Sequence, residues 1–149
     1  MNIKNLTESQ WEVSEKDYPV KRDVEGKIKF ILEYVILAPS SHNTQPWLFD
    51  VNNNVVDIIA NEKGWLRVAD KDKRELHISI GCAIENFVIS AENFGFSASI
   101  EYFPPDGEDI IARIKINPGL RNPKHPELFG FITKRMTNHN QYDNKPIEK

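Results

Sequence analysis

The stretch that most constrains this chain is residues 38–47, Ala-Pro-Ser-Ser-His-Asn-Thr-Gln-Pro-Trp. It lies between an apolar helical pattern and a strand-like pattern, which indicates a structured connection. Pro39 and Pro46 each remove a backbone donor and push the preceding residue, Ala38 or Gln45, towards extended geometry. We expect a stiff loop that presents hydroxyl and amide groups to a ligand with polar edges. The alternative is a proline-terminated helix whose serines and asparagine satisfy local backbone groups.

Length and composition favour a single soluble globular domain. A chain of 149 residues can bury roughly 68–70% of its unfolded surface. The sequence has no run of about 18 apolar residues, which excludes a membrane-spanning helix, and its first residues lack the apolar core of a secretory signal. Cys82 is the single cysteine and cannot form an internal disulfide. We therefore expect a cytoplasmic protein.

Charge is distributed unevenly along the chain. Residues 1–117 carry 13 Lys and Arg against 19 Asp and Glu, whereas residues 118–149 carry 6 against 3. An acidic body repels phosphates, so nucleic acid is excluded as its partner. The basic end of the chain can still meet a single phosphate group.

The first half of the sequence predicts an arm, a helix and a hairpin. Residues 1–26 are polar and indicate an irregular arm, with a short helix around Glu8–Lys16. From Lys27, apolar residues recur at helical spacing and stop at Pro39. Two strands follow, joined by an asparagine run that favours a tight turn because asparagine tolerates positive φ; they are Trp47–Val51 and Val55–Ile59.

The second half predicts a long helix, two more strands and a short helix. The helix runs from about Asp72 to Phe94, with a wide apolar face that places it at the centre of the fold. Asp70 or Asp72 caps its start, and Gly95 ends it. The remaining elements are strands Ala98–Phe103 and Ile110–Ile116 and a helix from Glu127 to about Lys134. Strand pairs interspersed with helices indicate an α+β fold, with the long helix packed on a small, mostly antiparallel sheet.

Residues that commonly carry catalysis or bind metals form no recognisable constellation. The four histidines show no metal-type spacing with a carboxylate or thiol, so no metal site is predicted. Cys82 lies in the apolar part of the long helix and is interpreted as core. The sequence has neither a Gly-x-Gly-x-x-Gly motif nor a phosphate-cradling loop with a following lysine. We assign no catalytic side chain.

Two motifs resemble those of the nitroreductase-like flavoproteins. Residues 38–49 are similar to the family signature Ala-Pro-Ser-Ser-x-Asn-x-Gln-Pro-Trp-x-Phe. Residues 81–91, followed by Gly95, resemble the central helix of that family, which runs Gly-x-Ala-x-x-Asn-x-x-x-x-Ala and closes on a glycine. The motifs occur in the expected order, on the elements assigned above.

Two further stretches resemble the long, Acg-like branch, which carries two nitroreductase-like halves in one chain. Residues 70–76 are similar to the approach to that branch's central helix. Residues 135–142 resemble the family's opening motif, Arg-x-Ser/Thr-x-Arg-x-x-Phe/Tyr, although His139 replaces the second arginine. The resemblance implies an N-terminal arm (1–26), a first repeat (27–117), and a linker with the start of a truncated second repeat (118–149).

The resemblance also implies a cofactor and its contacts. Family members bind FMN between two such halves and transfer hydride from NADH or NADPH to an acceptor. By analogy, Pro39, Ser40, Ser41 and Asn43 contact the isoalloxazine ring. Arg135 and Thr137 bind the phosphate, for which a guanidinium fork is well suited.

Three functions remain open at this point. The first is an FMN-dependent NAD(P)H oxidoreductase acting on a nitro, quinone or flavin-type small-molecule acceptor, with a second nitroreductase-like half or a homodimer partner. The second is a flavin-binding or flavin-sequestering protein without turnover. The third is a degenerate half-domain that serves as a dimerisation module through the helix face at Ile80, Ile84 and Phe87.

Overall fold

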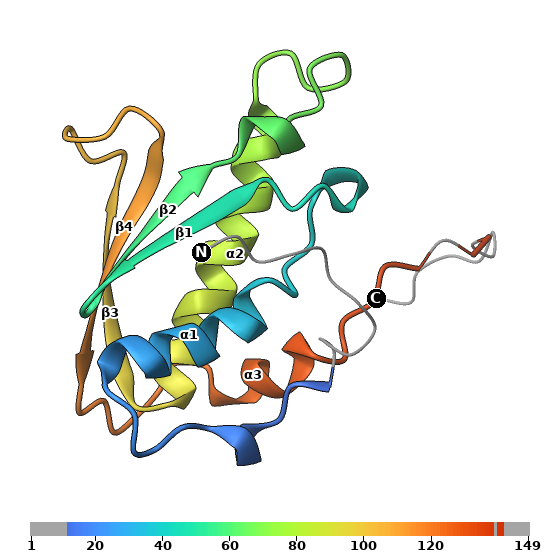
Figure 1. Ribbon diagram of the computed structural model, residues 1–149. Helices are drawn as coiled ribbons and strands as arrows, with labels where there is room; N and C mark the ends of the chain where they lie inside the picture. The colour runs from blue at the N-terminus through green and yellow to red at the C-terminus, as the bar shows by residue number, and fades with distance from the viewer. Residues whose placement is uncertain (1–11, 139, 142–149) are drawn as a thin grey trace.

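The computed structural model describes residues 12–138, 140 and 141. The chain forms a four-stranded antiparallel sheet in the order β1-β2-β4-β3. Helices α1 and α2 pack together on one side of this sheet, and α3 packs on α2 (Figure 1). The architecture is α+β, as the sequence predicts. The elements are α1 (Val24–Val35), β1 (Trp47–Asn52), β2 (Val55–Ala60), α2 (Arg74–Asn93), β3 (Phe96–Tyr102), β4 (Ile110–Pro118) and α3 (Pro126–Ile132).

The hairpin of β1 and β2 confirms the turn chemistry of the asparagine run. Asn52 pairs with Val55, and Asn53 between them has φ +55°. Strand β3 ends one residue earlier than expected because Phe103 has φ +51° and leaves the extended conformation. The shift of register between Ile58 and Ile59 marks an irregularity where β2 meets β4.

Helix α2 is held at its start by the carboxylate of Asp70. The Asp70 side chain is 3% exposed, and its two oxygens accept the amides of Glu75 and Leu76, each at 2.9 Å. The residue before the helix, Lys73, has φ +59°, so the chain turns sharply between Asp70 and the first helical turn. Asp72 contributes a single longer bond, 3.3 Å, to the amide of Arg74.

The inner face of α2 forms the centre of the core. Ile80, Ile84 and Phe87 are at most 4% exposed and pack against α1 and the sheet within this chain. The dimerisation-module hypothesis placed a protein interface on this face. That expectation is wrong, because the face is already covered by the chain's own elements.

Helix α1 begins earlier than predicted and uses two faces. It starts at Val24, not Lys27, because the side chain of Asp23 accepts the amide of Gly26 at 2.8 Å and caps the helix. One face joins the main core, while Phe30 and Tyr34 pack with Phe129 of α3 in a second cluster. This second face positions α3, and with it the segment that follows α3.

The residues before α1 form no α-helix in the described part. Of the helix expected around Glu8–Lys16, residues 8–11 lie outside the described residues, and a short 3₁₀ turn spans Glu15–Asp17. Tyr18 docks this arm by stacking on Phe94, with ring centroids 4.4 Å apart. Among the described residues, no helix is long and apolar enough to cross a membrane.

Candidate functional site

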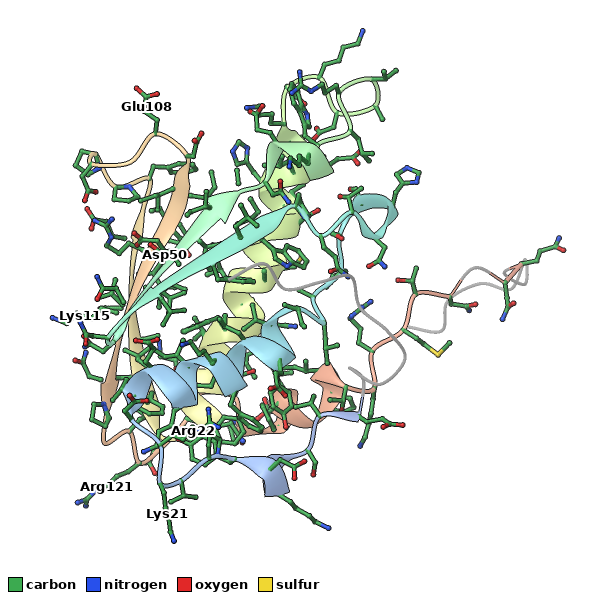
Figure 2. All side chains as sticks on the ribbon, in the orientation of Figure 1. Lys21, Arg22, Asp50, Glu108, Lys115 and Arg121 are labelled. Atoms are coloured by element: carbon green, nitrogen blue, oxygen red, sulfur yellow. The ribbon has the colours of Figure 1, made fainter. Side chains whose placement is uncertain are left out.

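A pocket of about 790 Å³ lies between the segment that follows α1 and the segment that follows α3. In Figure 1 both segments lie on the right of the molecule, beside the ends of these helices. Lys115 and Arg121, both labelled in Figure 2, project on the left of the molecule. The residues that line the pocket are Pro39, Ser40, His42, Asn43, Thr133, Lys134, Arg135, Met136 and Thr137.

The loop on the first wall is closed by its own hydrogen bonds. The Oγ atom of Ser40 accepts the amide of Gln45 at 3.0 Å, and the Ser40 carbonyl accepts the amide of Asn43 at 2.9 Å. His42, Asn43 and Gln45 have φ values of +50°, +55° and +48°. Histidine and asparagine are more common in this region than most residues, whereas a glutamine adopts it where its surroundings impose it. The extended conformation expected for Gln45 is therefore wrong, because the loop curls back on Ser40 before Pro46.

Ser41 is bonded to α2 and anchors the loop there. Its Oγ atom donates to Oε2 of Glu75 at 2.8 Å, and its amide donates to Oγ of Ser79 at 3.2 Å. Ser79 in turn donates its hydroxyl proton to the carbonyl of Glu75 at 2.8 Å. Of the four loop residues predicted to contact a ring, Ser41 is the one that does not line the pocket.

Gly64 supports the other end of the same loop. A Cβ atom at this position would lie 3.0 Å from the Cα of Pro46 and 3.1 Å from the carbonyl oxygen of Thr44. The absence of a side chain therefore lets the segment after β2 pack directly on the loop backbone. The amide of Asn61 adds a hydrogen bond of 3.1 Å to the carbonyl of Pro46.

The second wall is tied to the first by Arg135. Its Nη2 atom donates to the carbonyl of Leu37 at 3.1 Å, and its Nη1 atom donates to Oγ1 of Thr137 at 3.4 Å. Leu37 lies just beyond α1, where a cation also meets the negative end of the helix dipole. Arg135 and Thr137, predicted together as phosphate ligands, thus lie on the same wall of one pocket.

The lining of the pocket is basic although the chain as a whole is acidic. Among the described residues, the lining contains His42, Lys134 and Arg135 and no carboxylate, whereas the full chain has a formal net charge of −3. Hydroxyl and amide groups from Ser40 and Asn43 complete the donor set. This combination suits an anionic ligand that also has a polar edge.

The pKa of Asp70, whose carboxylate supports the start of α2, is shifted by its surroundings. Burial acts to raise the pKa of Asp70, but the amides of Glu75 and Leu76 outweigh it and lower the pKa below its usual value. The charged form of Asp70 therefore holds the first turn of α2, which carries Glu75, and Ser79 follows one turn later.

The sequence patterns located most of the pocket and missed part of it. Pro39, Ser40, Asn43, Arg135 and Thr137 all line the pocket, although the two segments are about ninety residues apart. Sequence reasoning missed four lining residues, which could have been found because they lie within or next to the two motifs; they are His42, Thr133, Lys134 and Met136.

The motif at residues 135–142 lies only partly within the described residues. Its remaining members, His139 and Tyr142, lie outside the described residues.

Within the described part of the chain, no group of three or more His, Cys, Asp or Glu side chains could hold a metal ion.

Two curated proteins of Mycobacterium tuberculosis strain H37Rv are similar to this chain. The one named "Putative NAD(P)H nitroreductase Rv3131" is 30% identical over 121 residues, which is 80% of this chain and 35% of the relative. The one named "Putative NAD(P)H nitroreductase acg" is 27% identical over 92 residues, which is 61% of this chain and 28% of the relative. The chain thus spans about a third of the length of the curated relatives that it matches.

Two solved bacterial structures share the fold. A protein described as "Putative NADH Oxidase" from Clostridium acetobutylicum has a TM-score of 0.55 at 16% identity, over 94% of this chain and 98% of that chain. A nitroreductase-like protein from Streptococcus mutans has a TM-score of 0.52 at 16% identity, over 64% of this chain and 80% of that chain. At these identities the likeness concerns the fold alone.

The family of the chain follows from a match over its first part. Residues 10–91 match the sequence model of the family described as "Putative TM nitroreductase". The matched range is 82 of the 149 residues, more than half of the chain, and it includes the loop 38–47 and most of α2. This chain therefore belongs to that nitroreductase family.

Proposed function

We propose that the pocket between residues 39–43 and 133–137 is an FMN site, and that the protein is an FMN-dependent NAD(P)H oxidoreductase. The observation that carries the proposal is the pairing of the two walls. A hydrogen-bonding loop that contains Ser40, His42 and Asn43 faces a segment that contains Lys134 and Arg135, and the described lining residues include no carboxylate. A flavin mononucleotide has the matching chemistry, because it joins a flat ring with polar edges to a phosphate.

The residues present fit such a group. Ser40 and Asn43 offer a hydroxyl and an amide to the polar edge of the ring, and Pro39 offers an apolar surface beside them. Arg135 and Thr137 are already joined by a hydrogen bond, so both can address one phosphate. A bound flavin supplies the redox chemistry, hydride transfer from NADH or NADPH to a nitro, quinone or flavin-type acceptor. The protein orients the ring and neutralises the phosphate.

A second nitroreductase-like half completes the site in this proposal. The chain spans about a third of the length of its curated relatives, and the described residues that line the pocket come from two segments. The missing walls come either from a second repeat of a longer chain or from a homodimer partner. We place the protein in the cytoplasm, where NADH and NADPH are available.

The first experiment is a titration of the 149-residue chain with FMN, followed by flavin absorption and fluorescence. We expect saturable binding, with riboflavin bound more weakly because it lacks the phosphate. Arg135→Ala should reduce FMN binding more than riboflavin binding, because it removes a phosphate contact as well as the bond to Leu37. Arg121→Ala is the matched control, because Arg121 is exposed on the side of the molecule opposite the pocket (Figure 2). If both this chain and a version extended through a second half bind FMN more weakly than about 1 mM, a free energy of about 4 kcal/mol, the proposal is contradicted.

Turnover separates an oxidoreductase from a flavin-sequestering protein. The flavin-loaded protein should oxidise NADH or NADPH in the presence of a quinone or nitroaromatic acceptor, at a rate above that of free FMN. Flavin binding without such oxidation would favour sequestration.

A further inference from the structure

We propose that Glu75 and Ser79 are positioning residues for the ring-facing loop, and that they act through Ser41. This inference rests on the proposed function, since it concerns how the chain holds the wall that meets a flavin ring. It also changes the role of Ser41, from a ring contact to an anchor.

Two hydrogen bonds connect the loop to the first turns of α2, and a third, within the helix, joins the two residues that make them. The carboxylate of Glu75 accepts from the Ser41 hydroxyl, and the hydroxyl of Ser79 accepts from the Ser41 amide. Ser79 is 3% exposed and donates to the carbonyl of Glu75, one turn earlier in the helix. The amide and the hydroxyl of Ser41 are thus both engaged by residues more than thirty positions away in the sequence.

Glu75 and Ser79, the helical residues that hold Ser41, are themselves fixed in position. The carboxylate of Asp70 holds the amides of Glu75 and Leu76, and Leu76 is buried in the main core. The first turn of α2 therefore cannot shift without disturbing the core. Because Ser41 is bonded to α2, its neighbours Ser40 and His42, which do line the pocket, are restrained as well.

The anchor also explains the backbone of the loop. Three residues after Ser41 have positive φ values, namely His42, Asn43 and Gln45. Such conformations persist where the surroundings impose them. Ser41 is held on one side of this run and Pro46 on the other, the latter by the amide of Asn61. The side chain of Asn43 is therefore presented to the pocket by a loop fixed at both ends.

A simpler role for Glu75 must be distinguished from this one. A glutamate in the first turn of a helix also stabilises the helix through its charge at the positive end of the dipole. Glu75→Gln removes the charge but keeps an oxygen that can accept from Ser41. Glu75→Leu removes both. Rescue by glutamine therefore separates the hydrogen bond from the charge.

The test measures FMN affinity and the absorption spectrum of the bound flavin for wild type, Glu75→Gln, Glu75→Leu and Ser41→Ala. Glu85→Leu is the control, because Glu85 is exposed further along the same helix. We expect Glu75→Leu and Ser41→Ala each to weaken binding about tenfold and to shift the flavin band, as loss of a hydrogen bond to a charged group implies. Glu75→Gln should stay within about threefold of wild type. The double variant Glu75→Leu/Ser41→Ala should be no weaker than either single variant.

The results that overturn the inference differ from those that overturn the proposed function. Wild-type binding by Glu75→Leu, equal losses for glutamine and leucine, or additive losses in the double variant would each contradict the positioning role. Failure of both the wild-type chain and a version extended through a second half to bind FMN contradicts the proposed function instead. The anchor is then tested by amide hydrogen exchange at Ser41, which should be faster in Glu75→Leu and Ser79→Ala and unchanged in Glu85→Leu. Unchanged exchange in the first two variants would contradict it.

Discussion

Arg135 Nη2 donates a hydrogen bond of 3.1 Å to the carbonyl oxygen of Leu37, a residue 98 positions earlier in the chain. This bond joins the segment after α3 to the segment after α1, and these segments are the two walls of the pocket. The pocket therefore depends on the packing of α3 as much as on the motifs that line it.

Replacing Arg135 by lysine keeps the charge but removes the planar fork that reaches Leu37 and Thr137 together. We expect the free energy of unfolding to fall by about 1 kcal/mol, the net value of one hydrogen bond, measured by urea denaturation. Arg121→Lys is the matched control and should leave stability unchanged, because Arg121 is exposed (Figure 2). Equal losses in the two variants would contradict a specific role for the bond to Leu37.

Replacing Gly64 by alanine should destabilise the protein. The new Cβ would lie 3.0 Å from the Cα of Pro46 and 3.1 Å from the carbonyl of Thr44, and backbone atoms cannot yield without moving the loop. We expect a loss of about 1–3 kcal/mol in chemical denaturation. Gly81→Ala provides the control, because no heavy atom lies within 4 Å of its added Cβ. That variant should gain about 0.5–1 kcal/mol from helix propensity, and a loss in both variants would argue against the steric explanation.

Asp70 should give the protein an acid-sensitive stability. Its pKa is lowered in the folded state, so its contribution is present above the unfolded pKa of about 3.9 and is lost as pH falls through the folded pKa. Asp70→Asn should lower the melting temperature at pH 7 and flatten its decline below about pH 4. Glu108→Gln controls for the loss of one negative charge at an exposed site (Figure 2). If the melting temperature of Asp70→Asn fell as steeply with decreasing pH as that of wild type, this assignment would be contradicted.

Tyr34 should make the fold sensitive to alkali. Its hydroxyl is buried and has no hydrogen-bond partner among the described residues, and burial, with nearby Glu15, Glu33 and Asp17, raises its pKa to about 12. A pKa raised above the unfolded value of about 10 means that stability falls as pH rises from about 10 to about 12. Tyr34→Phe should remove that decline.

At neutral pH the same variant should gain about 1 kcal/mol of stability, because phenylalanine buries no unpaired hydroxyl. Denaturant unfolding at pH 7 and at pH 11 checks both expectations. A loss of stability at pH 7 would show that the hydroxyl has a stabilising partner.

Local patterns in the sequence predicted the main elements of the fold. Apolar spacing located α2 within two residues at its start and one at its end, since a helix buries residues three and four apart on one face. The asparagine run located the hairpin turn, because Asn53 adopts a positive φ at low cost. The start of α1 was misplaced by three residues, since the cap at Asp23 precedes the apolar pattern.

The sequence by itself determined which elements form and which short motifs carry hydrogen-bonding and basic groups, because both depend on neighbours within a few positions. Only the tertiary structure decided which of those groups meet. Packing of α3 against Tyr34 brought Arg135 to Leu37, and the first turn of α2 placed Glu75 where it accepts the hydroxyl of Ser41. A serine can donate to a ligand or to a carboxylate, and the choice depends on which partner the folded chain places within hydrogen-bond distance.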